Sequence, residues 1–153
     1  MSAAERLAAL GLTLPPVTAP VAAYVAAVRT GAYVYVSGQV PVTDGKLAAT
    51  GKVGAEVAVE DAAAMARTCA LSALAAAASA AGGLDRIRRI VKVVGFVSSA
   101  PGFGGQPQVI NGASELLIEV FGEDGKHARS AIGVAELPLN APVEVELIAE
   151  VRD

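Results

Sequence analysis

The sequence has little of several residue types on which common kinds of site depend. Its 153 residues include one cysteine, one histidine and no tryptophan. A zinc site takes several cysteine or histidine ligands, and no Ser-His-Asp arrangement stands out, so neither site is expected. A glycine cluster at Gly102, Gly104 and Gly105 lacks the remaining residues of a dinucleotide or phosphate loop. We therefore expect no metal and no cofactor.

The single cysteine also bears on the core. Cys69 has no partner for a disulfide. It lies in an alanine-rich segment with helical spacing, where a free cysteine behaves as a small apolar side chain. We expect it to be buried.

Positive charge and aromatic side chains are scarce as well. The chain has 12 Lys and Arg against 15 Asp and Glu, a formal net charge of −3, and 4% aromatic residues. Nucleic-acid surfaces combine clustered basic residues with aromatic ones, so no nucleic-acid partner is expected. The N-terminus lacks the pattern of a secretory signal, and no run looks apolar enough to span a bilayer. These features predict a cytoplasmic protein with no membrane partner.

What the sequence does have is a regular alternation of apolar segments, with 54% hydrophobic residues. We expect residues 1–20 to form an extension with a short helix, and residues 21–153 to form one domain. Strand patterns cover residues 21–28, 32–37 and 90–97 and two C-terminal segments, and helical patterns cover residues 57–81 and 109–120. This order predicts an α+β domain. Apart from Lys92, the strand at 90–97 is apolar on both faces, which predicts a sheet covered on both sides.

The two C-terminal segments, residues 127–138 and 143–146, carry the charged residues that say most about function. Strand alternation puts Arg129, Ala131 and Gly133 on one face of the first segment, so the guanidinium lies beside small residues. In the second segment, Glu144 and Glu146 share the face opposite to an apolar row. We expect the three charged groups to meet near adjacent strands. Because arginine matches both oxygens of a carboxylate and stays protonated, a small carboxylic acid is the expected ligand.

Short motifs along the chain resemble those of the Rid family, the reactive intermediate deaminases, also called the YjgF type and often labelled endoribonuclease L-PSP. The matching elements are Tyr24, the run 34–41 with its Ser37-Gly38-Gln39 turn, the Ala-Arg-Ser element around Arg129 and the Leu-Pro pair at 137–138. Their order and spacing match over residues 24–151. The resemblance implies a chorismate-mutase-like mixed sheet with two main helices on one face. It also implies a homotrimer with ligand clefts between subunits.

The resemblance further implies a reaction and a set of site residues. The best understood members hydrolyse reactive enamines and imines of 2-oxo acids to the oxo acid and ammonia. By this resemblance, Arg129 would bind the substrate carboxylate and Glu144 would position or deprotonate the attacking water. Tyr24 would line the cleft across the interface, and the turn at Ser37 and Gly38 would shape its floor.

The sequence departs from the family pattern at positions that bear on the ligand. Ala131 stands where deaminating members often have a cysteine, and Gly133 stands where a larger side chain is common. The position of a family asparagine in the second helix falls on Ser114, whereas Asn111 lies nearly one turn earlier. These differences predict a divergent branch with a wider cleft or another ligand, and they leave both Ser114 and Asn111 open as contacts.

Each assignment has a structural alternative. Arg129 could pair with a glutamate, Glu144 could be a solvated charge, and Tyr24 could be a packing residue. The turn at Ser37 could be only a turn, and His127 is expected to be exposed without a role. Three functions remain, in this order: an imine hydrolase, a non-catalytic trimer that binds a small carboxylate or senses metabolites, and a ribonuclease.

Overall fold

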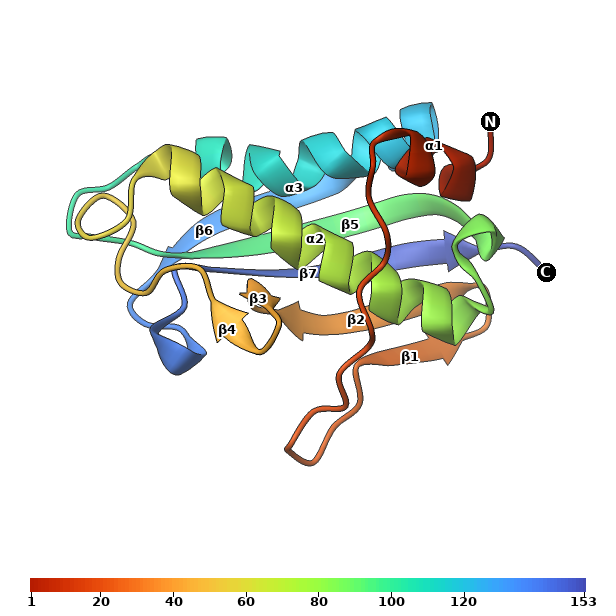
Figure 1. Ribbon diagram of the computed structural model, residues 1–153, viewed down its shortest axis with the longest axis horizontal. Coiled ribbons are helices and arrows are strands. Elements are labelled where there is room, and N and C mark those ends of the chain that lie inside the picture. Colours follow the sequence, from red (N-terminus) through yellow and green to blue (C-terminus); the bar gives the residue numbers. More distant parts are fainter.

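The computed structural model describes residues 1–153 and is built on a five-stranded sheet in the order β1-β2-β7-β5-β6 (Figure 1). The strands are β1 (Ala27–Thr30), β2 (Tyr33–Gln39), β5 (Ile87–Ser98), β6 (Ala128–Val134) and β7 (Val143–Val151). β5 and β6 run parallel, and all other neighbours are antiparallel. A separate hairpin of β3 (Val42–Thr43) and β4 (Lys46–Leu47) turns at Asp44 and Gly45, which both have positive φ. The predicted mixed α+β fold is confirmed.

Two long helices, α2 (Val59–Ala81) and α3 (Gln106–Phe121), lie on one face of the sheet (Figure 1). α2 ends at Gly82, whose φ of 91° is in the left-handed region that glycine adopts without a steric penalty. The two helices approach closely, because a Cβ added to Gly112 of α3 would collide with the carbonyl oxygen of Ala63 in α2. Short 3-10 turns are η1 (Leu84–Arg86), η2 (Gly122–Gly125) and η3 (Pro138–Asn140).

The alanine-rich helix α2 is the centre of the core. Cys69 is fully buried in it, as predicted, and burial raises the pKa of its thiol well above the usual value. By length and composition alone α2 could cross a membrane, which differs from our expectation from the sequence. However, 61% of its apolar window is buried inside the domain. A core helix passes the same test, and the packing of α2 on β2, β7 and α3 makes it one.

The opposite face of the sheet is open in the single chain, so the prediction that β5 is covered on both sides is wrong for one chain. Val93 and Val97 are fully buried under the helices, whereas Val94 and Phe96 on the other face are only half-buried. The open face also carries exposed apolar or aromatic side chains from the other strands, namely Val28, Tyr33, Tyr35 and Ile132. Such an apolar face is suited to contact with another protein surface.

Two local predictions near the N-terminal strands are also wrong. The strand expected at 21–28 begins only at Ala27, and the preceding residues 21–25 form an exposed loop that projects from the body in Figure 1. No strand pairs with this loop, so its apolar residues cannot enter the sheet. The expected turn at 37–39 lies inside β2, where the register with β7 shifts between Val36 and Gln39. It is a bulge in a continuing strand.

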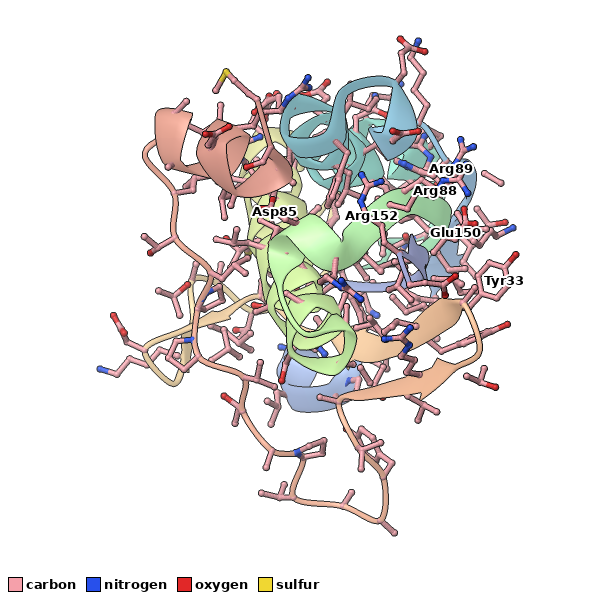
Figure 2. The ribbon with its side chains drawn as sticks, turned by 90° about the vertical axis from the view of Figure 1, so that its right-hand side faces the viewer. Tyr33, Asp85, Arg88, Arg89, Glu150 and Arg152 are labelled. Atoms are coloured by element: carbon pink, nitrogen blue, oxygen red, sulfur yellow. The ribbon has the colours of Figure 1, made fainter.

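The N-terminal helix α1 (Ala3–Ala9) is attached to one end of the domain. It packs on α3, and its Leu7 is buried in the core. The backbone N–H of Ala4 donates to the Asp85 carboxylate at 2.9 Å. Figure 2 shows Asp85 beside this helix and, at the same end of the sheet, Arg88 near Glu150, with which it forms a 3.2 Å ion pair. Residues 1–20 are therefore fixed to the domain at α1.

Candidate active site

Arg129 projects from the edge strand β6 towards α3, on the helix side of the sheet. Its Nη1 donates to Asn111 Oδ1 at 2.8 Å and to Ser114 Oγ at 3.2 Å. These two acceptors are three residues apart on α3 and so lie on one helix face. Both positions that the sequence left open therefore contact the guanidinium. Neither partner is a carboxylate, so the positive charge of Arg129 is not neutralised by its own chain.

Ser114 connects Arg129 to the single histidine. Ser114 Oγ lies 2.8 Å from His127 Nε2, and His127 Nδ1 lies 2.6 Å from the carbonyl oxygen of Gly125. Because a carbonyl oxygen only accepts, we assign the ring proton to Nδ1, and Nε2 then accepts from the Ser114 hydroxyl. Burial lowers the pKa of His127, as does the charge of Arg129, while the bond to Gly125 opposes the shift.

The expectation that His127 is exposed was wrong. The ring is half-buried because α3 supplies Ser114 on one side and the turn η2 supplies the Gly125 carbonyl on the other. Neither contact is visible in a strand pattern. The only signal in the sequence was the position of the single histidine, two residues before Arg129.

Small residues follow Arg129 on the same face of β6, as strand alternation predicted. Ala131 is partly buried against the core. A Cβ added to Gly133 would lie 2.9 Å from Gln106 Nε2 and 3.0 Å from Ser99 Oγ, which are themselves hydrogen-bonded at 3.1 Å. A larger side chain at position 133 would therefore displace a polar pair at the start of α3.

Glu144 lies on the open face of β7. Val143 and Val145 are buried, so Glu144 and Glu146 share the opposite face, as predicted. Burial raises the pKa of the Glu144 carboxyl, and the charge on Glu146 raises it further. Gly38, in the bulge of β2, lies against this carboxylate, because a Cβ added there would collide with Glu144 Oε1. Because Gly38 has no side chain, the Glu144 carboxylate has room to lie over β2.

Arg129 and Glu144 do not meet within one chain, which corrects our expectation of adjacent strands. The sheet order places β5 between β6 and β7. Arg129 pairs with Val93, which is buried under the helices, and Glu144 pairs with Phe96, which is on the open face. The two charged groups therefore project from opposite faces. Two surface hollows of about 280 and 370 Å³ in the single chain are lined by neither of them.

Tyr24 lies in the projecting loop, and Ser37 lies in β2 beside the end of that loop. Ser37 Oγ donates to the carbonyl oxygen of Val25 at 2.6 Å, and the Ser37 N–H donates to that of Ala26 at 2.9 Å. Ser37 therefore holds the end of the loop against β2. Tyr24 is 57% exposed, so it is not a packing residue of its own chain and is free to contact another molecule.

A five-stranded mixed sheet with two long helices on one face is the architecture of the chorismate-mutase-like class of α+β domains. Comparison with protein families agrees: the model of the YjgF/chorismate mutase-like family, whose description includes the name endoribonuclease, matches residues 4–151. The chain therefore belongs to the YjgF family, as its motifs indicated, and the match includes α1.

Individual relatives differ in how closely they match. Protein TCP17 of Trypanosoma cruzi is 45% identical over 98% of this chain and 94% of that protein. The crystal structure of Atu1372 from Agrobacterium tumefaciens has 47% identity and a TM-score of 0.91, covering 98% of this chain and 92% of that one. The structure of E. coli TdcF with bound serine has 27% identity and a TM-score of 0.61, covering 90% and 94%. The backbone is thus more similar to Atu1372 than to TdcF.

Proposed function

We propose that this protein is a hydrolase that converts small 2-imino or enamine acids to 2-oxo acids and ammonia in the cytoplasm. The observation that carries the proposal is Arg129, a guanidinium held by two neutral oxygens, without a carboxylate partner and beside small residues. Such a group binds a planar carboxylate through two parallel hydrogen bonds. The family relative TdcF holds serine, a small molecule with a carboxylate, which supports this ligand class.

We further propose that the site is shared between copies in a homotrimer. Since Arg129 and Glu144 project from opposite faces of one sheet, a site that uses both needs two chains. In a cyclic assembly, the β6 edge of one copy would lie over the open face of the next, so that Arg129 faces the neighbour's carboxylate. The apolar side chains of the open face and the exposed Tyr24 support this arrangement.

The reaction needs few catalytic groups, because an imine carbon is already electrophilic and the protein has mainly to hold the substrate and orient one water. An enamine first tautomerises to the imine. The oxygen of a water then bonds to the imine carbon, one water proton passes to Glu144, and Glu144 returns it to the nitrogen. The C–N bond of the resulting carbinolamine breaks as the hydroxyl proton passes to the nitrogen, so that ammonia leaves and the carbonyl forms. A raised pKa makes Glu144 a stronger base than an ordinary carboxylate. No metal or cofactor takes part.

A second candidate is a non-catalytic trimer that binds a small carboxylate or senses metabolites. It is favoured by Ala131, which replaces a cysteine that deaminating members often carry. A ribonuclease, the function in the family label, has less support. The formal net charge of −3 disfavours a polyanionic ligand, because binding a phosphate backbone depends on an excess of positive charge.

The experiment is to generate 2-iminobutyrate with a threonine dehydratase and to follow the imine that semicarbazide traps. We expect the wild-type protein to accelerate imine loss and Arg129→Ala to lose about 100- to 1000-fold in kcat/KM, since removing a charged partner costs about 3–4 kcal/mol. If both proteins are inert but 2-oxobutyrate raises the Tm of wild type alone, the binding function is correct. RNA cleavage that survives purification and is lost with a site substitution would support the ribonuclease.

A further inference from the structure

A continuous chain of hydrogen bonds leads from the protein backbone to Arg129. The Gly125 carbonyl accepts from His127 Nδ1, His127 Nε2 accepts from Ser114 Oγ, and Ser114 Oγ accepts from Arg129 Nη1. Arg129 is the only member of this chain that carries a permanent charge. The other three groups, the Gly125 carbonyl, the His127 ring and the Ser114 hydroxyl, hold the guanidinium in one orientation through these hydrogen bonds.

Gly125, the first group in this chain of hydrogen bonds, has a fixed position. Gly125 is buried, and a Cβ added to it would collide with the Leu117 carbonyl and lie 2.8 Å from Ile118 Cα. Its backbone therefore lies directly against α3, the helix that also carries Ser114. Because both ends of the histidine are bonded to parts of the same rigid unit, the ring cannot turn without breaking one of these bonds.

The histidine decides which way the Ser114 hydroxyl points. A serine hydroxyl has one proton and two acceptor lone pairs, and it rotates to suit its partners. A neutral ring with an unprotonated Nε2 takes the hydroxyl proton, which leaves a lone pair for the N–H of Arg129. Burial lowers the pKa of His127, which favours this neutral ring.

We infer that His127 is a positioning residue that fixes Arg129 for its carboxylate ligand through Ser114. Both ring nitrogens are already hydrogen-bonded, so neither nitrogen is free to bond the ligand. Asn111 holds the same Nη1 atom separately, so the guanidinium loosens when His127 is lost but stays near α3. The identity of the ligand as a carboxylate rests on the proposed function, whereas the fixed orientation of the guanidinium does not.

The experiment uses the fact that His127 is the single histidine of the chain, so its NMR signals are unambiguous. In the wild type we expect the ¹⁵N shifts of a neutral Nδ1–H ring and slow rotation of the Arg129 guanidinium, seen as separate Nη signals. Ser114→Ala and His127→Phe should each make that rotation fast. His127→Gln should restore slow rotation, because an amide oxygen can accept the Ser114 proton.

Enzyme assays on the same variants separate positioning from folding. With His127→Phe we expect KM for the imino acid to rise roughly 3- to 10-fold, the range expected for one hydrogen bond, while kcat changes little. His127→Gln should bring KM most of the way back. A residue that only stabilised the fold would instead change Tm and the amount of active protein, without such a division between KM and kcat.

Two results would overturn the inference whatever the activity: an Nε2–H or charged ring in the wild type, or guanidinium rotation that is equally slow in His127→Phe. A wild-type KM in an active His127→Phe protein would also overturn it. Slow rotation that is lost in His127→Phe and recovered in His127→Gln, in a protein that hydrolyses no imine, would reject the proposed reaction and keep the positioning role.

Discussion

Arg129 on the helix side of the sheet and Glu144 on the open side are held in different ways. On the helix side, Arg129 is fixed by oxygens of Asn111 and Ser114 on α3. On the open side, Glu144 forms no ion pair and no side-chain hydrogen bond, and it lies half-buried against Gly38. The arginine is thus preorganised within its own chain, whereas the carboxylate has no partner there.

This difference corresponds to two different tasks. A group that binds a ligand gains from being held in place before the ligand arrives, because less freedom is lost on binding. A group that accepts a proton gains from a raised pKa and from access to water. Neither side of one chain has both properties, so we expect activity only where the two sides come from different copies.

The largest effect is expected from preventing that assembly. Ile132 is 44% exposed on the open face of β6, so Ile132→Glu should leave the single chain folded but place a charge in the proposed subunit contact. We predict monomers in sedimentation experiments and loss of more than about 100-fold in activity.

A matched control is available in the segment after α1, where Val17 is also 44% exposed. Val17→Glu introduces the same charge away from β6 and α3 and should leave assembly and activity close to wild type. Assembled, active Ile132→Glu protein would show that the open face is not the contact surface.

Replacing the proposed base should have the next largest effect. Glu144→Gln keeps the size of the side chain but cannot accept a proton, and we predict a fall in kcat of about 100-fold. In the wild type, kcat/KM should fall as the pH drops through the raised pKa of Glu144, and this limb should be missing in the variant. A wild-type kcat for Glu144→Gln would exclude the carboxylate as the base.

Glu144→Gln should raise the stability of the fold at neutral pH, although it lowers the activity. Because folding raises the pKa of Glu144, the folded chain binds this proton more tightly than the unfolded chain. The wild type therefore loses stability as the pH rises from the usual carboxyl range through the raised value. We predict that, in the monomeric Ile132→Glu background where no neighbouring guanidinium faces Glu144, Tm of Glu144→Gln exceeds that of the protein with Glu144 at neutral pH and equals it in acid, as measured by thermal melts across this range.

A smaller effect is expected at the glycine beneath the carboxylate. Gly38→Ala adds a Cβ that collides with Glu144 Oε1, while its φ is not in the left-handed region, so the backbone accepts alanine. We predict an activity loss of roughly 3- to 10-fold with little change in Tm. Gly104→Ala is the control, since an added Cβ there meets nothing within 4 Å. Equal effects of the two substitutions would contradict the role of Gly38.

Much of the fold could be predicted from local patterns. The helical spacing of 109–120 and the alternation around Arg129 correspond to α3 and to the two faces of β6. These patterns depend only on neighbours in the chain. The sheet order does not, because a strand pattern fixes which residues share a face but not which strand lies alongside. For this reason the separation of Arg129 and Glu144 by β5 was missed.

The positions around Arg129 show the same limit. Ser114 and Asn111 could not be ranked from the sequence, and the structure places both on the guanidinium because they are one helical turn apart. The contact of His127 depends on η2 bringing the Gly125 carbonyl beside α3, which no local pattern encodes.

The central claim, that one site uses Arg129 of one copy and Glu144 of another, is tested most directly by mixing two inactive variants. Arg129→Ala and Glu144→Gln proteins are unfolded together and refolded as a one-to-one mixture. In a cyclic assembly with random mixing, about a quarter of the sites then combine an intact arginine with an intact carboxylate, so about a quarter of wild-type activity should return. A mixture that stays as inactive as its two components, although mixed assemblies are detected, would contradict the shared site.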